Sequence, residues 1–312
     1  MPELTKVAYI FPGQASQKVG MGQDLYDRYD SARNVFNQAD EALGFSLSRM
    51  CFEGPEDELN QTVNTQPALV TVSLAYLVAA QSAGDGKVLP AASYVAGHSL
   101  GEYTALAATG VLDVPETVRL ARERGRLMYE TGLQRIGSML AVIGLDEIAL
   151  RDICSETDTG IANFNCPGQL VISGVKDNLD KAATLAQEKG AKRVVPLAVS
   201  GAFHSPLMQA AVDGLSQAID SSSFKEPSVP IIANTTAQPM TSVQEVKEEL
   251  IRQMCNAVQW QRSVEYMIDN CVSTFIEIGP GRVLSGLIRR INSDVTTLNI
   301  GDAAAVEKLA AE

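Results

Sequence analysis

The residues best suited to chemistry stand in one short run, Gly97-His98-Ser99-Leu100-Gly101. Residues 93–96 before it predict a strand and residues 100–109 predict a helix. A serine at such a strand-to-helix turn is held in a strained conformation, and the glycines two places away let neighbouring chains pass closely. The amide that follows it points from a helix N-terminus, where it can stabilise an oxyanion. We therefore favour Ser99 as a nucleophile over a chance glycine-serine turn.

A nucleophilic serine needs a base, and the chain contains only two histidines. His98 adjoins Ser99, so its side chain is expected to point away from the serine side chain. His204 lies in the loop 200–206, which enters a predicted helix. On the residues alone, a catalytic and a structural or surface role for His204 remain equally open.

Arginine is the residue type that best matches a carboxylate group of a substrate, because its planar guanidinium binds both oxygens. One helix, predicted from an N-cap at Asp113 to about residue 129, carries four of them. Helical periodicity prevents all four from facing the same way. Composition does not choose among them, and the default for each is a solvated face: Arg119, Arg122, Arg124 and Arg126.

The elements that must position these residues alternate along most of the chain. Strands are predicted at 7–11, 93–96, 229–234, 274–278 and 295–300, with helices between them, which indicates a parallel sheet covered on both faces. Residues 137–199 instead follow the order strand, helix, strand, strand, helix, strand, which is typical of a ferredoxin-like unit. We predict an α/β fold, with an α/β-hydrolase-like catalytic domain (1–136 and 200–312) and an inserted ferredoxin-like subdomain (137–199).

Composition narrows the possible partners and the compartment. A net charge of -12 disfavours nucleic acid, and an acidic partner would need a local basic patch. The five cysteines form no C-x-x-C pair, which argues against a disulfide framework or a zinc site and for a reducing compartment. No secretory signal is predicted at the N-terminus. The apolar stretch 68–80 is too short and too polar for a membrane span and predicts a buried helix.

Six short motifs together resemble the malonyl-CoA:acyl carrier protein transacylases, the acyltransferase family that also provides domains of fatty acid and polyketide synthases. The resemblance runs from about residue 7 to residue 291 in the family's order. The motifs are Phe11-Pro12-Gly13-Gln14-Ala15-Ser16-Gln17, Gly97-His98-Ser99-Leu100-Gly101-Glu102-Tyr103, Arg124-Gly125, Phe203-His204-Ser205, Val258-Gln259-Trp260 and Glu277-Ile278-Gly279-Pro280-Gly281.

The resemblance implies a role for each catalytic group. Ser99 would carry the acyl group as an ester, with His204 as its general base. A main-chain carbonyl near the Val-Gln-Trp motif would orient the histidine, which points to Gln259, mainly through its backbone. The amides of Gln14 and Leu100 would form the oxyanion hole.

The resemblance also implies the substrate. Arg124 would hold the free carboxylate of a malonyl group, and the ring of Phe203 would occupy the space that an α-methyl group needs. One departure from the family is Ala15, where a glycine is usual. The reaction would need malonyl-CoA and holo acyl carrier protein, with no metal or redox cofactor.

The expected setting is fatty acid biosynthesis in a bacterial cytoplasm or a plastid stroma. The alternatives are a free-standing acyltransferase of a polyketide pathway and a serine esterase or thioesterase, which would use the same turn but pass the acyl group to water.

Overall fold

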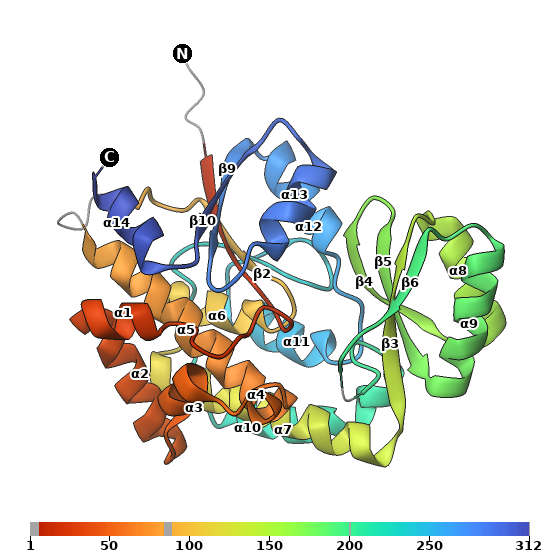
Figure 1. Cartoon of the computed structure of the whole chain (residues 1–312), viewed down its shortest axis with the longest axis horizontal. Helices are drawn as coiled ribbons and strands as arrows, with labels where there is room; N and C mark the ends of the chain where they lie inside the picture. The colour runs from red at the N-terminus through yellow and green to blue at the C-terminus, as the bar shows by residue number, and fades with distance from the viewer. Residues whose placement is uncertain (1–5, 84–88, 200, 312) are drawn as a thin grey trace.

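A six-stranded sheet forms the centre of the computed structural model, which describes residues 6–83, 89–199 and 201–311. Its order is β10-β9-β1-β2-β7-β8 (Figure 1). Neighbouring strands are parallel, except that β7 and β8 are antiparallel. The strands are β1 (Lys6–Phe11), β2 (Tyr94–Gly97), β7 (Ile231–Ile232), β8 (Pro239–Met240), β9 (Val272–Ile278) and β10 (Thr296–Ile300). The predicted parallel sheet is confirmed, although the strand expected at 229–234 is much shorter. Residues 1–5 and 200, which belong to the predicted domain boundaries, lie outside the described residues.

Helices cover both faces of this sheet. Successive residues of β1 point to opposite faces, so each face contributes to its own hydrophobic core. Val7, Tyr9 and Phe11 join one hydrophobic core, whereas Ala8 and Ile10 join another. The first core contains residues of α2 and α5, and the second contains residues of α12 and α13. The helices of this large unit are α1 (Gln23–Arg28), α2 (Asp30–Leu43), α3 (Leu47–Glu53), α4 (Glu56–Leu59), α5 (Thr62–Ser82), α6 (Gly101–Ala108), α7 (Val114–Gln134), the 3-10 helix η2 (Pro206–Ala211), α10 (Val212–Asp220), α11 (Val243–Gln253), α12 (Trp260–Asp269), α13 (Val283–Ile291) and α14 (Ala303–Ala311).

Helix α5 is the central helix of the large unit and is buried along most of its length. The expectation that the stretch 68–80 is too short and too polar to cross a membrane is wrong, because the helix extends to Thr62 and is then long and apolar enough, but 89% of the relevant window is buried inside the fold. The buried helix expected at 68–80 is therefore confirmed. The helix begins at Thr62, five residues before Pro67, so this proline stands inside the helix.

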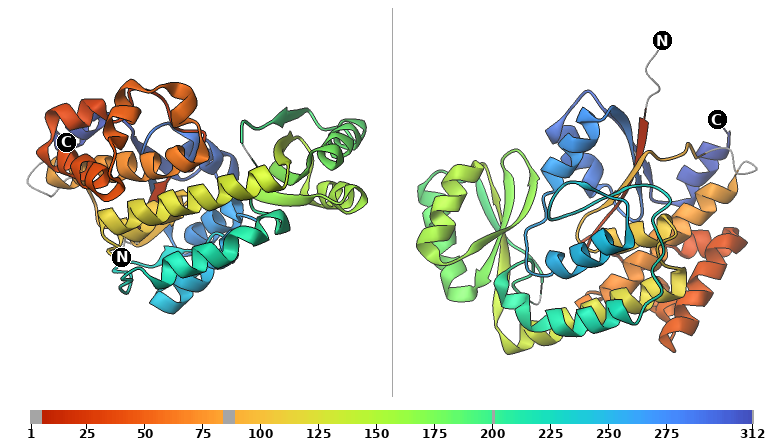
Figure 2. Two further views of the ribbon diagram at one scale, coloured as in Figure 1. Left: turned by 90° about the horizontal axis from the view of Figure 1, so that it is seen from below. Right: turned by 180° about the vertical axis from the view of Figure 1, so that it is seen from behind.

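Residues 137–196 form a second sheet with the order β4-β5-β3-β6, antiparallel throughout. Two helices pack against it around a separate core. Both views of Figure 2 show this small unit standing at one side of the large one, reached through the end of α7. Its elements are β3 (Gly137–Ile143), α8 (Glu147–Thr157), β4 (Gly160–Cys166), β5 (Gln169–Val175), α9 (Lys176–Glu188) and β6 (Arg193–Pro196).

Main-chain hydrogen bonds join the two units. The Val258 amide donates to the Ala162 carbonyl, and the Phe164 amide donates to the Val258 carbonyl, each at 2.8 Å. The loop between α11 and α12 is thereby fixed to β4. Because this loop also approaches the carboxyl edge of the large sheet, the small unit borders the region where Ser99 lies.

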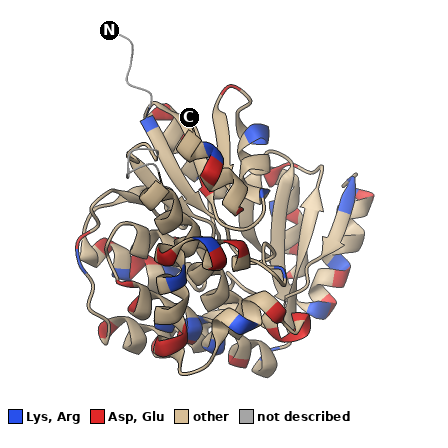
Figure 3. Cartoon of the chain, turned by 60° about the vertical axis from the view of Figure 1, so that its left-hand side comes forward, with Lys and Arg blue, Asp and Glu red and all other residues tan. Residues whose placement is uncertain are grey.

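Lys and Arg positions are interspersed with Asp and Glu positions along the ribbon (Figure 3). Several of them form ion pairs within one helix, such as Arg126 with Glu123 and Glu130 on α7. Such exposed pairs contribute about 0.3–0.5 kcal/mol each, so they do little to hold the fold together. All five cysteines are free thiols.

Candidate active site

Ser99 stands on a tight turn between β2 and α6, and both flanking glycines are required by close backbone contacts. A Cβ atom at Gly97 would lie 1.9 Å from the main-chain carbon of Gly101, and one at Gly101 would lie 2.1 Å from the Phe11 carbonyl oxygen. Ser99 itself has φ 52°, in the left-handed region, which costs an L-residue about 1–2 kcal/mol. The turn predicted from the glycine spacing is therefore present.

The structure brings His204 to Ser99 across 105 positions of the chain. Its Nε2 lies 2.7 Å from the Ser99 Oγ, and its Nδ1 lies 2.9 Å from the Gln253 carbonyl oxygen. A carbonyl only accepts hydrogen bonds, so Nδ1 carries the proton and Nε2 is free to accept the serine proton. This geometry is that of a nucleophile and its general base.

The prediction that Gln259 orients the histidine is wrong. The Gln259 amide donates to the Asn234 carbonyl, and its side chain accepts from Arg262. Gln253 provides the carbonyl instead, because it is the last residue of α11 and carbonyls of a last helical turn lack an amide partner within the helix. That end of the helix is also its negative pole, which favours an imidazole that takes up a proton.

The two amides predicted for the oxyanion hole are unused by the protein. In the part of the chain that the structure describes, neither the Gln14 amide nor the Leu100 amide donates a hydrogen bond to another residue. The Gln14 side chain is held by the Thr62 hydroxyl at 2.9 Å. Ala15, which follows it, has φ 76°, a conformation that favours glycine and explains the residue usual in the family.

Arg124 is the one of the four arginines on α7 that points into the site. It is 1% exposed, and its Nη2 lies 3.2 Å from the Ser99 Oγ. Its other partners are neutral amides, the Oε1 atoms of Gln66 and Gln253 at 2.7 and 2.8 Å. Among the described residues it forms no ion pair, and its Nε has no hydrogen-bond partner. A buried cation without an anion is costly, so this guanidinium is poised for an anionic ligand.

The other three arginines serve the scaffold. Arg119 donates to the Ala42 carbonyl, Arg122 donates to the Val63 carbonyl, and Arg126 forms surface ion pairs. Helical periodicity excluded a common direction for all four, and packing against α5 decides which one faces Ser99.

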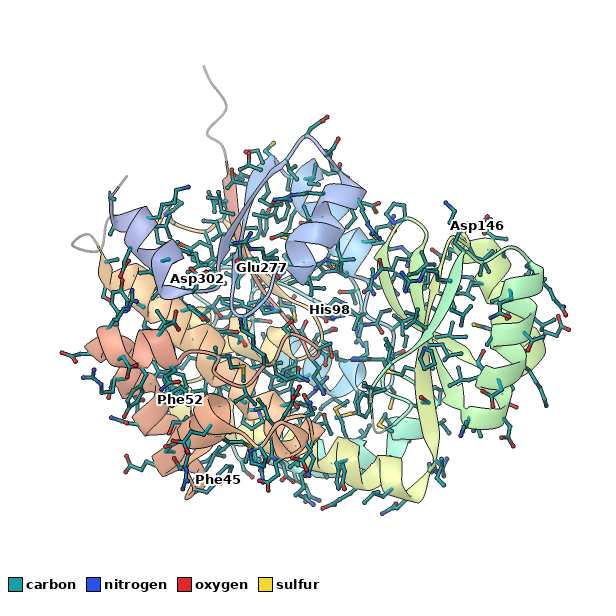
Figure 4. The ribbon with its side chains drawn as sticks, viewed as in Figure 1. Phe45, Phe52, His98, Asp146, Glu277 and Asp302 are labelled. Atoms are coloured by element: carbon teal, nitrogen blue, oxygen red, sulfur yellow. The ribbon has the colours of Figure 1, made fainter. Side chains whose placement is uncertain are left out.

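Phe203 and His98 flank the site without touching the serine hydroxyl. Phe203 is buried next to His204, and its ring lies 3.0 Å from where a Cβ atom of Gly201 would stand. His98 points away from Ser99, as predicted: its Nε2 lies 2.8 Å from the Oδ1 of Asn165 on β4. Figure 4 shows His98 between the large and the small unit.

Comparisons with known proteins agree with this geometry. The acyl transferase domain family matches residues 8–309. The chain is 43% identical to the malonyl CoA-acyl carrier protein transacylase of Bacillus subtilis (strain 168), over 97% of this chain and 96% of that protein. The chain belongs to this transacylase family.

Solved structures of family members superimpose closely. The acyl-carrier-protein-S-malonyltransferase of Bartonella henselae has a TM-score of 0.92 at 42% identity, covering 97% of this chain and 98% of that one. A malonyl-transacylase in complex with a type II PKS acyl-carrier protein has a TM-score of 0.92 at 37% identity, covering 98% and 99%. The mixed α/β fold with a largely parallel sheet is therefore the fold of this acyltransferase family.

Several residues of this transacylase-family site were missed from the sequence. Gln66 and Gln253 hold Arg124, and Asn234 accepts a hydrogen bond from the Ser99 amide at 2.7 Å. Glutamine and asparagine are common on surfaces, so their type carries little information. Only Glu102 could have been recognised as a site residue from the sequence, because it directly follows the Gly97–Gly101 run.

Burial and the neighbouring positive charge of Arg124 lower the pKa of His204 to about 3. Burial also lowers the pKa of His98. Because both pKa values are depressed, the neutral rings persist as pH falls through 6.5, the ordinary value. The contribution of these two histidines to folding stability falls below pH 6.5, since their imidazoles take up protons in the unfolded chain but not in the folded chain.

NMR of histidine-labelled protein tests these directions, because the chain has only two histidines. We expect the His204 imidazole not to titrate between pH 8 and pH 5 and the His98 imidazole to titrate below 6.5, and a His204→Gln variant assigns the two signals. A midpoint near 6.5 for the His204 signal would contradict the buried, neutral base described here.

Proposed function

We propose that this chain transfers a malonyl group from malonyl-CoA to the phosphopantetheine thiol of acyl carrier protein, through a malonyl ester on Ser99. The observation that carries this proposal is the buried Arg124 guanidinium, which forms no ion pair within the described residues and lies 3.2 Å from the Ser99 Oγ. A planar guanidinium at this distance can hold a carboxylate while the adjacent acyl carbon is attacked. The names of the family members given above support the same substrates.

In the first half of the reaction, Nε2 of His204 takes the Ser99 proton and Oγ attacks the thioester carbonyl. The amides of Gln14 and Leu100 stabilise the oxyanion. The carbon–sulfur bond then breaks, and coenzyme A leaves with the proton from His204. In the second half, the carrier thiol gives its proton to His204 and attacks the ester, and Ser99 leaves with that proton. This chemistry needs no metal or redox cofactor.

We further propose that Phe203 excludes an α-methyl group from the acyl pocket. Its ring is held next to His204 between Gly201 and the end of α7, where a Cβ atom at Gly201 would lie 3.4 Å from Gly132. A rigid ring beside His204 leaves no room for a methyl branch at the α-carbon of the acyl group. Methylmalonyl-CoA would therefore be a poorer donor than malonyl-CoA.

We propose a two-domain description of the fold: residues 1–136 and 200–312 as an α/β-hydrolase-like domain, and residues 137–199 as a ferredoxin-like subdomain. The order β4-β5-β3-β6 supports the second assignment, because a ferredoxin-like unit places its first and third strands in the middle of the sheet. The proposed setting is fatty acid biosynthesis in a bacterial cytoplasm or a plastid stroma.

The hydrolase alternative is disfavoured by how His204 is oriented. In α/β-hydrolases a carboxylate normally performs this task. Among the described residues, no carboxylate contacts the His204 ring, and Nδ1 donates to the Gln253 carbonyl. The polyketide alternative is supported by the similarity to a malonyl-transacylase bound to a type II PKS acyl-carrier protein. Comparing kcat/KM with a fatty acid carrier and a polyketide carrier decides between the two settings.

Intact mass spectrometry tests the proposed function directly. The protein is mixed with malonyl-CoA alone, and we expect a mass gain of one malonyl group, which disappears when holo acyl carrier protein is added and reappears on the carrier. Release of free coenzyme A without a stable ester would instead indicate a hydrolase. No gain and no release would exclude malonyl-CoA as the donor.

A further inference from the structure

Glu102 is a fully buried carboxylate in the first turn of α6, three residues after Ser99. Its Oε1 accepts from the Asn234 amide at 2.8 Å and from the Asn234 Nδ2 at 2.9 Å. Its Oε2 accepts from the Gln253 Nε2 at 2.6 Å. The mechanism above assigns no task to this group, although burying a charge there is costly.

Through Asn234, Glu102 is linked by hydrogen bonds to the backbone on both sides of Ser99. The Asn234 Oδ1 accepts from the Ser99 amide, and its Nδ2 donates to the Gly97 carbonyl, both at 2.7 Å. Asn234 therefore clamps the turn from both sides of Ser99. Glu102 sets the direction of this side chain, because an acceptor beside Nδ2 forces Oδ1 toward the serine amide.

Through Gln253, Glu102 is linked by hydrogen bonds to Arg124, and the main chain of the same glutamine contacts His204. The Gln253 Nε2 also donates to the Ser99 carbonyl at 3.0 Å, while its Oε1 accepts from Arg124 at 2.8 Å. Its main-chain carbonyl accepts from His204 at 2.9 Å. Glu102 sets the direction of this amide too, since an acceptor beside Nε2 turns Oε1 toward the guanidinium.

We propose that Glu102 is a positioning residue that, through Asn234 and Gln253, holds Ser99 and Arg124 in register and so sets the preference for a dicarboxylic acyl group. All three of its partners are N–H donors, so both of its oxygens act as acceptors, which favours the ionised form. Burial and the neighbouring Glu249 carboxylate raise the pKa of Glu102 well above its ordinary value, and the three hydrogen bonds oppose that rise.

Glu102→Gln tests this role because it reverses the polarity of one contact while keeping the shape. The new NH₂ group cannot face Asn234, whose main-chain N–H cannot rotate away. It must face Gln253, whose amide then flips, gives up its hydrogen bond to the Ser99 carbonyl and presents its own NH₂ group to Arg124. Arg124 loses one of its two amide acceptors and moves, whereas the Gln253 carbonyl that holds His204 is unaffected.

Glu249→Gln is the matched control. Glu249 is 2% exposed, lies on α11 and accepts hydrogen bonds from the amide and hydroxyl of Thr235, next to Asn234. This substitution removes a similarly buried carboxylate close to Glu102, whose pKa Glu249 raises, but Glu249 makes no hydrogen bond to Gln253 among the described residues. A purely structural effect of losing a buried carboxylate should appear in both variants.

The measurement is the rate of Ser99 acylation by malonyl-CoA and by acetyl-CoA, with the melting temperature of each variant. This test rests on the proposed function, which fails separately if wild-type protein gains no malonyl group. For Glu102→Gln we expect the malonyl-to-acetyl ratio of kcat/KM to fall about tenfold or more, as for the loss of a hydrogen bond to a charged group. For Glu249→Gln we expect an unchanged ratio.

An unchanged ratio in Glu102→Gln, or an equal fall in both variants, would overturn the proposal. If Glu102→Gln does not fold, Gln253→Met replaces it. This variant removes the link between Glu102 and Arg124 but keeps the carbonyl that holds His204. It should lower the ratio to a similar extent, and a wild-type ratio in Gln253→Met would equally overturn the proposal.

Discussion

Ser99→Ala is expected to abolish acylation by malonyl-CoA and to lower malonyl transfer to the carrier at least about 10⁴-fold, in line with the loss of other catalytic serines. The reason is that the Ser99 Oγ is the atom that lies 2.7 Å from the base and 3.2 Å from Arg124. Intact mass after incubation with malonyl-CoA shows the first effect, and a carrier acylation assay measures the second.

Ser73→Ala is the control for this experiment. Ser73 is buried on α5 in the same unit, and its Oγ finds no hydrogen-bond partner in the part of the chain that the structure describes. This variant removes a serine hydroxyl from the interior without touching the site, so it should gain the malonyl group at the wild-type rate. A malonyl gain in Ser99→Ala would mean that another residue carries the ester.

Arg124→Ala is expected to lower kcat/KM for malonyl-CoA about 10²- to 10³-fold, which corresponds to about 3–4 kcal/mol. The malonyl carboxylate would enter a buried pocket without a cation, and its desolvation would go uncompensated. Acetyl-CoA has no carboxylate, and without the guanidinium it no longer leaves a buried charge unpaired. The preference for malonyl over acetyl should therefore collapse, as measured by acylation rates with the two thioesters.

Arg122→Ala serves as the comparison, because it removes an arginine from the same helix, two residues away, whose guanidinium bonds the Val63 carbonyl. Its malonyl-to-acetyl ratio should match that of wild type. A large loss with malonyl-CoA accompanied by an equal loss with acetyl-CoA in Arg124→Ala would show that Arg124 supports the fold of the site and does not bind the carboxylate.

Local features of the chain could be predicted because neighbouring residues alone determine them. The run Gly97–Gly101 predicts the turn at Ser99, since a Cβ atom at Gly97 would lie only 1.9 Å from the main-chain carbon of Gly101 and only glycine lacks that atom. The N-terminus of α11 is a local feature of the same kind, because Ser242 and Glu245, three residues apart, form a capping box there. Period-two and helical patterns likewise predicted the parallel sheet and the separate order of residues 137–196.

The partners in the site could not be predicted in the same way, because they lie far apart in the chain. His204 meets Ser99 across 105 positions, and Gln253 meets the Ser99 carbonyl across 154. Gln259 was predicted to orient His204 because Gln259 belongs to a recognisable motif. The end of α11 instead presents the free carbonyl of Gln253, and only helix packing decides which carbonyl lies there.

By itself, the sequence determined the nucleophilic turn, the alternation of strands and helices, and the resemblance that pointed to Arg124. The tertiary structure decided which arginine is buried, which carbonyl orients the base, and that Glu102 underlies the site through two amide side chains. The physical reason is range: backbone strain, capping and periodicity act within a few residues, whereas the pairing of buried polar groups depends on strand order and helix packing.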